Sequence, residues 1–109
     1  MQPDVLSARG PGYYRLKLVR GGWGVPCLIT HQDGLWQATI DGQEFGAVED
    51  PLSSDELVSI WTWGRQSSEQ EYRYLTALRQ SAPPDHPCHH PDRPINFLTT
   101  TLHPVRSAP

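Results

Sequence analysis

Two Asp-Gly dipeptides set the strongest constraint on what this chain can fold into. Asp33-Gly34 and Asp41-Gly42 each separate two short runs in which apolar and polar residues alternate. An Asp-Gly pair favours a type I′ turn, which needs positive φ at both central residues and joins antiparallel strands. The stretch 13–48 is therefore predicted to be a four-stranded antiparallel meander. A sheet this small is expected to curl toward an SH3-like barrel, because closure protects the strand edges.

The first predicted strand has a basic face. In the run YYRLKLVR, alternation places apolar residues on one face and Tyr13, Arg15 and Lys17 on the other, with Arg20 just beyond. Aromatic and basic side chains on a sheet can stack on nucleic-acid bases and neutralise phosphates. Nucleic-acid binding through this face is therefore an alternative function. Few cations are aligned, however, and the formal net charge of −3 argues against a general polyanion binder.

The stretch 53–81 is predicted to be helical. Ser53 and Glu56 have the spacing of a capping box, in which the Ser53 hydroxyl accepts a hydrogen bond from the Glu56 backbone amide. The run LVSIWTW that follows is also rich in β-branched and aromatic residues, so a strand over 54–63 remains the competing prediction.

A second capping box opens a longer helix. Ser68 and Glu71 have the same spacing and precede the run EQEYRYLTALRQ, which predicts a helix over residues 69–81. Pro83-Pro84 ends that helix, because proline removes a donor and clashes with the preceding turn.

These elements fit one α+β domain spanning residues 1–109. Residues 1–12 are expected to be a flexible lead, and residues 83–109 a proline-rich tail that docks only in part. Within that tail the apolar run INFLTTTL could add a further strand.

Charge is unevenly distributed along the chain. Residues 33–56 contain seven acids and no Lys or Arg, whereas residues 1–20 contain four bases and one acid. This distribution predicts a basic end and an acidic end, unless folding intermixes them. The chain has no apolar signal segment, no run approaching ~18 apolar residues and only two cysteines. We therefore expect a cytoplasmic protein with reduced thiols and no membrane partner.

The run HPCHHP, residues 86–91, concentrates potential metal ligands. Zinc sites usually combine two separated Cys/His pairs, and here either His86 with Cys88 or Cys88 with His90 would have to join Cys27 and His31. On a strand, Cys27 and His31 share a face but lie ~13 Å apart, too far to hold one ion. A zinc-supported domain is thus a third hypothesis, and a proline-stiffened tail without metal is favoured.

The sequence shows no enzyme motif. It contains no phosphate-binding P-loop, no dinucleotide-binding glycine pattern and no nucleophile elbow. Cys88 and His89 are adjacent, but a catalytic thiol and its base usually come from distant segments. The prediction is a protein that is not an enzyme and that needs no cofactor.

Protein binding is the function that the aromatic residues favour. Trp61 and Trp63 cannot face the same side of a helix, so at least one exposed tryptophan is expected, and tryptophan and arginine dominate interface energetics. The predicted contact set combines these tryptophans with an acidic belt that could occupy a basic channel. Its members are Trp61, Trp63, Glu44, Glu49, Asp50, Asp55 and Glu56.

Three segments carry a resemblance to a known group of proteins. GYYRLKLVRGGWGVP, EYRYLTALRQSAP and HPDRPINFLT, in this order, make the chain similar to small uncharacterised proteins encoded by bacteriophages and prophages. The resemblance covers about half of the chain, and residues 51–64 depart from it. It implies a host or phage protein as the partner, and inhibition of a host defence complex by occlusion, as anti-CRISPR proteins do. It supplies no catalytic residue and leaves the oligomeric state open.

Overall fold

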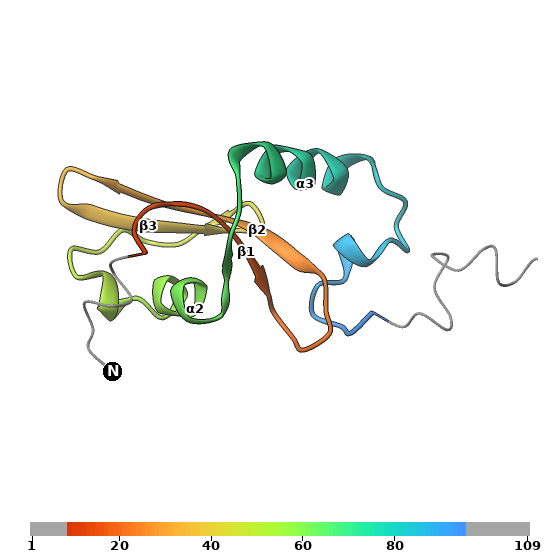
Figure 1. The fold of residues 1–109 in the computed structure, drawn as a ribbon, viewed down its shortest axis with the longest axis horizontal. Helices are drawn as coiled ribbons and strands as arrows, with labels where there is room; N and C mark the ends of the chain where they lie inside the picture. The colour runs from red at the N-terminus through yellow and green to blue at the C-terminus, as the bar shows by residue number, and fades with distance from the viewer. Residues whose placement is uncertain (1–8, 96–109) are drawn as a thin grey trace, which may run out of the picture.

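The computed structural model describes residues 9–95, which form one five-stranded sheet with two α-helices. Figure 1 shows α2 and α3 on opposite sides of the sheet. The elements in chain order are β1 (Gly12–Lys17), β2 (Gly24–Gln32), β3 (Leu35–Ile40), β4 (Gln43–Glu44), the 3₁₀ helix η1 (Pro51–Ser53), α2 (Asp55–Trp63), β5 (Arg65–Gln66), α3 (Glu69–Ser81) and the 3₁₀ helix η2 (Pro87–His89).

Both Asp-Gly turns form as predicted. Asp33 and Gly34 have φ of 54° and 76°, and Asp41 and Gly42 have φ of 53° and 85°. Positive φ at both central positions is what a type I′ turn requires. Each turn joins two adjacent antiparallel strands, β2 to β3 and β3 to β4.

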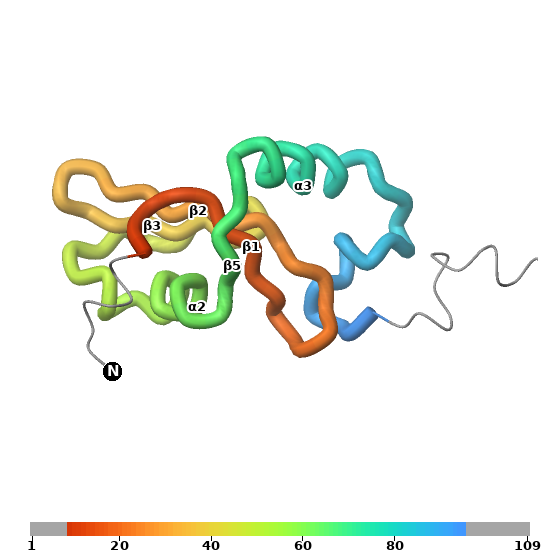
Figure 2. The backbone as a smooth tube through the Cα atoms, in the orientation of Figure 1, coloured from red at the N-terminus to blue at the C-terminus, as the bar shows by residue number. Residues whose placement is uncertain are grey.

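The sheet is open, so the prediction of a curled, SH3-like barrel is not confirmed. Its strand order is β4-β3-β2-β1-β5, with every pairing antiparallel. Helices cover both faces instead: α2 contacts β1 and β3, while α3 contacts β1 and β2. Figure 2 shows the two helices on opposite sides of the sheet. The strand β5 was not predicted; it joins the sheet beside β1 after the chain has passed through α2.

The predicted fourth strand, residues 43–48, is shorter than expected. β4 ends at Glu44, and after the intervening stretch Val48 forms an isolated bridge with Trp36. The loop containing Gly46 separates the two pairings, in keeping with the low strand propensity of glycine.

One face of the sheet carries the main core. Side chains from β1, β2 and β3 pack there against Leu57, Ile60 and Trp61 of α2. The indole of Trp61 meets Trp36 edge to face at 5.4 Å between ring centroids and donates its Nε1–H to the Gly10 carbonyl at 3.1 Å. The strand residues of this core are Tyr14, Leu16, Val25, Cys27, Ile29 and Ala38.

The described part of the predicted flexible lead is tied to this core. The guanidinium of Arg9 donates to the carbonyls of Trp61 and Gly64 at the carboxyl end of α2, where a cation complements the helix dipole. The Tyr14 hydroxyl lies 2.8 Å from the Arg9 carbonyl oxygen. Residues 1–8 lie outside the described residues.

The helix α2 is confirmed over the strand alternative, but its cap is Ser54 and not Ser53. The Ser54 hydroxyl accepts the backbone N–H of Leu57 at 3.2 Å. Ser53 lies one residue earlier, in η1, and its hydroxyl donates to the Asp50 carbonyl. The capping box was therefore predicted one residue too early.

Replacing Ser54 with alanine should destabilise the protein by about 1 kcal/mol, because the Leu57 amide loses its acceptor at a buried helix start. The exposed Ser53→Ala variant is the matched control and should stay within about 0.5 kcal/mol of the wild type. Urea unfolding of both variants measures this difference. An equal loss in the two variants would contradict the assignment of Ser54 as the cap.

The helix α3 spans Glu69–Ser81, as the sequence predicts, and covers the second face of the sheet. The Ser68 hydroxyl accepts the backbone N–H of Glu71 at 3.0 Å. The rings of Tyr13 and Tyr72 pack at 5.1 Å, and Arg79 forms an ion pair with Asp41. The first strand's basic face is thus partly covered.

The last described residues of the predicted tail, Pro94 and Ile95, are docked onto the connection between β1 and β2. Gly22 bridges to Pro94, and the Ile95 amide donates to the Gly21 carbonyl at 3.0 Å. Most of the run INFLTTTL, predicted as a further strand, lies outside the described residues. No helix within residues 9–95 is long and apolar enough to cross a membrane.

Candidate functional site

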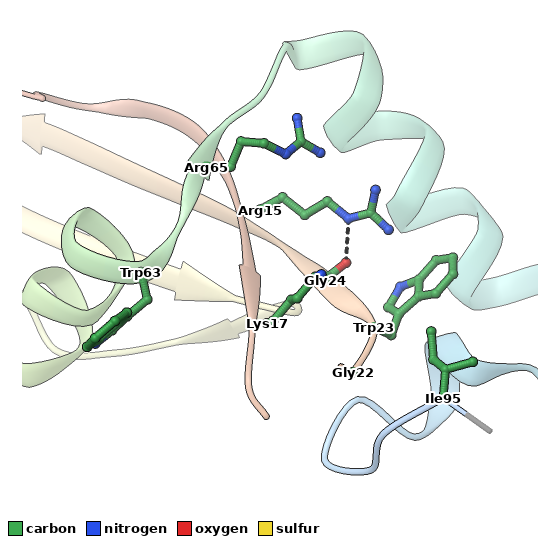
Figure 3. Close-up of a pocket in the computed structure, with 8 residues that line it drawn as sticks. All are labelled: Arg15, Lys17, Gly22, Trp23, Gly24, Trp63, Arg65 and Ile95. Atoms are coloured by element: carbon green, nitrogen blue, oxygen red, sulfur yellow. Dashed lines mark hydrogen bonds between the residues drawn. The ribbon is translucent and has the colours of Figure 1, made fainter. Parts of the chain in front are cut away.

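A groove of about 580 Å³ lies where β1, the start of β2, β5 and the docked tail meet (Figure 3). It combines cationic side chains with two indole rings. We call it the Trp63 groove, and its lining residues are Arg15, Lys17, Gly22, Trp23, Gly24, Trp63, Arg65 and Ile95.

Arg15 is held in one conformation by three partners. Its Nε donates to the Gly24 carbonyl at 2.8 Å, its guanidinium lies 5.0 Å from the centre of the Trp23 ring, and Nη1 lies 3.3 Å from Glu71 Oε2 (Figure 3 shows the first bond). A Cβ at position 24 would come within 2.7 Å of Arg15 Nε. The glycine at that position therefore gives the Arg15 side chain room to lie against β2.

The other two cations are more accessible. Arg65, on β5, reaches the same Glu71 oxygen at 3.1 Å, yet 64% of its side-chain surface remains exposed. Lys17 is exposed at the end of β1, and within residues 9–95 it forms no ion pair. The groove therefore contains three cationic side chains, and two of them, Arg15 and Arg65, share the carboxylate of Glu71.

The two tryptophans of the groove differ in availability. Trp63 is 77% exposed at the last position of α2. Trp23 is half-buried, because the Arg15 guanidinium lies over its ring and the His86 imidazole meets it edge-on at 5.2 Å. Trp63 is therefore the indole that can bury a large apolar area against a partner.

These groups are suited to binding. The described residues lining the groove include no carboxylate, imidazole or thiol that could act as a general acid, base or nucleophile. What they offer is positive charge, an exposed indole and the apolar edge of Ile95. An anionic ligand with an apolar group matches this combination.

Of the two tryptophans predicted as contacts, the structure leaves only Trp63 at the surface. Trp61 is 1% exposed and lies in the core, so its predicted role as a surface contact is wrong. The sequence does indicate the burial of Trp61, because Leu57, Ile60 and Trp61 lie at positions i, i+3 and i+4, which share one face of a helix. Trp63 lies off that face.

The alternative set on the first strand is brought only partly to the groove. Arg15 and Lys17 line it, but Tyr13 is half-buried against Tyr72 and Arg20 is not among the lining residues. Arg65 was missed by the sequence analysis, since nothing local to Arg65-Gln66 indicates that this pair joins the sheet edge beside β1.

The acidic belt lies on other elements. Glu44, Glu49, Asp50 and Asp55 are exposed and Glu56 is half-buried. They belong to β4, the segment around η1 and the first turn of α2. Since β4 and β5 are opposite edges of the sheet, the strand order keeps Glu44 apart from the cations of β1 and β5.

The HPCHHP run forms the ordered turn η2 with its imidazoles directed to backbone groups. His86 Nδ1 accepts the Cys88 amide at 3.0 Å, while His89 Nε2 and His90 Nε2 lie 3.1 Å and 3.0 Å from the carbonyls of Ala82 and Pro84. Cys88 is buried. Within residues 9–95, no three Cys, His, Asp or Glu side chains gather as a metal-binding group.

Cys27 and His31 form the other half of the hypothetical zinc set. They lie in different environments, one in the core and one at the surface. Cys27 is fully buried in the core, and burial raises the pKa of its thiol to about 12, with the Asp41 carboxylate adding to the effect. His31 is exposed and stacks on Trp36 at 3.9 Å. One side chain therefore lies in the core and the other at the surface, and the two do not form half of a metal site.

Comparison with known proteins adds no family to these observations. No protein-family model matches the chain, and neither the curated proteins nor the solved structures contain a significant match to it.

Proposed function

We propose that this chain is a non-enzymatic binding protein that captures a protein partner through the Trp63 groove. The observation that carries the proposal is the 77% exposure of Trp63 beside a groove lined by arginines and a lysine. Tryptophan and arginine are the residue types that contribute most to interface free energy. The fold supports this use, because Trp61 fixes α2 in the core and so fixes Trp63 at the rim.

The partner we propose is a host or phage protein. The resemblance of the sequence to phage-encoded proteins motivates this class, and inhibition of a defence complex by occlusion is the specific form of the hypothesis. Occlusion needs a rigid surface and no reactive group. The sheet, with a helix on each face, supplies such a surface.

The acidic belt is a second candidate contact surface for a protein partner. Four of its five carboxylates are exposed, and the strand order places β4 away from the cationic edge. A partner bound there would have to be basic, whereas a partner in the Trp63 groove would not. The two surfaces therefore make different predictions for the same experiment.

Capture from a bacterial lysate should depend on Trp63. We expect tagged wild-type protein to retain one or more partners in quantitative mass spectrometry, and the Trp63→Ala variant to retain at least about tenfold less, corresponding to about 1.4 kcal/mol or more for an interface anchor. The triple variant Glu49→Lys, Asp50→Lys, Asp55→Lys should retain the same partners as the wild type. Loss in the triple variant with full retention by Trp63→Ala would place the interface on the acidic belt instead.

A further inference from the structure

The charge around Trp63 indicates what kind of partner segment the groove accepts. Glu71 offers a single oxygen, Oε2, to both Arg15 and Arg65. Arg15 is also committed to the Gly24 carbonyl and to the ring of Trp23. Lys17 and most of the Arg65 side chain are exposed, so an incoming anion would meet these two groups first.

The apolar component of the groove is divided by β1. The close-up view shows Lys17, Trp23 and Ile95 on one side of this strand and the ring of Trp63 on the other, turned away from them (Figure 3). A ligand that contacts both the exposed Trp63 indole and Lys17 therefore has to extend across β1, as a protein segment several residues long can.

A protein segment fits this arrangement better than a nucleic-acid strand does. Single-stranded nucleic acid is bound by successive bases stacking on several free aromatic rings along a cationic track. Within the described residues of this face, Tyr13 packs on Tyr72, and Arg15 lies over the ring of Trp23, which leaves Trp63 as the free indole.

We infer that the Trp63 groove binds an acidic segment of a protein, with Asp or Glu carboxylates paired to Lys17 and Arg65 and an apolar side chain packed on Trp63. Arg15 acts as a positioning residue that keeps Glu71 and Trp23 in place. This inference deepens the proposed function and rests on it, because it names the chemistry of the segment that the groove would capture.

The test uses synthetic peptides and the ¹⁵N-labelled full chain. One peptide has a Phe-Leu centre flanked on both sides by glutamates; two matched peptides carry glutamine or lysine in place of every glutamate, and a thymidine oligonucleotide serves as the nucleic-acid probe. The indole N–H signal of Trp63 is identified from the spectrum of Trp63→Phe. We expect the acidic peptide to shift this signal, with a Kd that rises with salt, and the other probes to bind at least about tenfold more weakly.

Charge reversal identifies the cations involved. The Lys17→Glu, Arg65→Glu double variant should raise the Kd of the acidic peptide at least about tenfold, since two attractive pairs become repulsive. The control is Arg73→Glu on α3, an exposed arginine outside the groove that pairs with Glu69, and it should leave the Kd within about twofold.

Each other outcome has a defined meaning. Equal binding of the glutamine peptide, tighter binding of the oligonucleotide, an equal effect of Arg73→Glu, or no shift of the Trp63 signal by the acidic peptide would overturn the inference. If lysate capture still depends on Trp63 in any of these cases, the proposed binding function stands and only the acidic segment is refuted. If capture does not depend on Trp63, the proposed function itself fails.

Discussion

The Trp61→Ala variant should lose about 3–5 kcal/mol of unfolding free energy, the largest effect that we expect from a single substitution in this protein. Trp61 is 1% exposed, meets Trp36 edge to face and donates a hydrogen bond to the Gly10 carbonyl. Its removal would leave a cavity between α2 and the sheet and would take away one of the two donors near the Gly10 carbonyl, the other being the Tyr14 hydroxyl at 2.9 Å. A domain of this size is typically stable by only about 5–15 kcal/mol, so the substitution should remove a large part of the total.

The matched control is Trp63→Ala, two residues away on the same helix. Because Trp63 is 77% exposed, its loss should change stability by no more than about 0.5 kcal/mol. If Trp61→Ala is too unstable to purify, Trp61→Phe keeps most of the volume, removes the N–H and gives a smaller loss by urea unfolding. Equal losses for Trp61→Ala and Trp63→Ala would contradict the core and surface assignment of the two indoles.

This pair of variants also separates stability from binding. Trp61 places α2, and α2 places Trp63 at its last position next to β5. Trp63→Ala should abolish capture while the protein stays folded, whereas Trp61→Ala acts on capture only through the fold. A partner-binding defect in Trp63→Ala at unchanged stability would therefore assign that side chain to the interface directly.

The features that sequence predicts well here are local ones. Asp33-Gly34 and Asp41-Gly42 specify their turns because backbone conformation at two residues decides the outcome. Ser68 specifies the start of α3 in the same way, through a hydrogen bond three residues along the chain. For α2, the sequence offers both Ser53 and Ser54 as possible caps. In the structure the Ser53 hydroxyl bonds to the Asp50 carbonyl within η1, which leaves Ser54 as the cap.

The features that sequence misses depend on packing between distant segments. Arg65-Gln66 becomes a strand only because α2 returns the chain to the free edge of β1, and the barrel is avoided because α2 and α3 occupy both faces of the sheet. The Trp63 groove combines residues from four separate segments, so no sequence motif predicts it. The pairing of Glu71 with Arg15 and Arg65 spans 56 and 6 positions along the chain and has no sequence signature.

The predicted separation of charge depends partly on local sequence and partly on packing between distant segments. The acidic run over 33–56 and the basic start of the chain are visible in the sequence, but their separation in space depends on strand order. Had β4 folded back beside β1, the two would have neutralised each other. In the sheet that forms, three strands place β4 and β5 on opposite edges, and the cations of β1 and β5 remain able to attract an acidic partner.

Raising the pH from 9 to 12 should cost about 3 kcal/mol of stability through Cys27 alone, with a slope that approaches about 1.4 kcal/mol per pH unit in the middle of this range. The thiol is fully buried in the core, and this burial, with the nearby Asp41 carboxylate, raises its pKa from 9.0 to about 12. Above pH 9 the unfolded chain releases this proton while the folded chain keeps it. Stability therefore falls as pH rises, and the loss is complete once the folded thiol also ionises.

The Cys27→Ala variant isolates this contribution from other groups that titrate in the same range, including Tyr72, whose pKa burial also raises. The measured quantity is the unfolding free energy of each protein by urea at a series of alkaline pH values. We expect the wild-type curve to fall away from the variant's curve between pH 9 and pH 12 and to parallel it below pH 9. Alkylation with iodoacetamide gives an independent readout, because Cys27 should react in urea and stay unreacted in the folded protein at pH 9. Parallel curves throughout, or rapid alkylation of folded protein, would show that the thiol is accessible to water and that the core beneath α2 is looser than the packing described here.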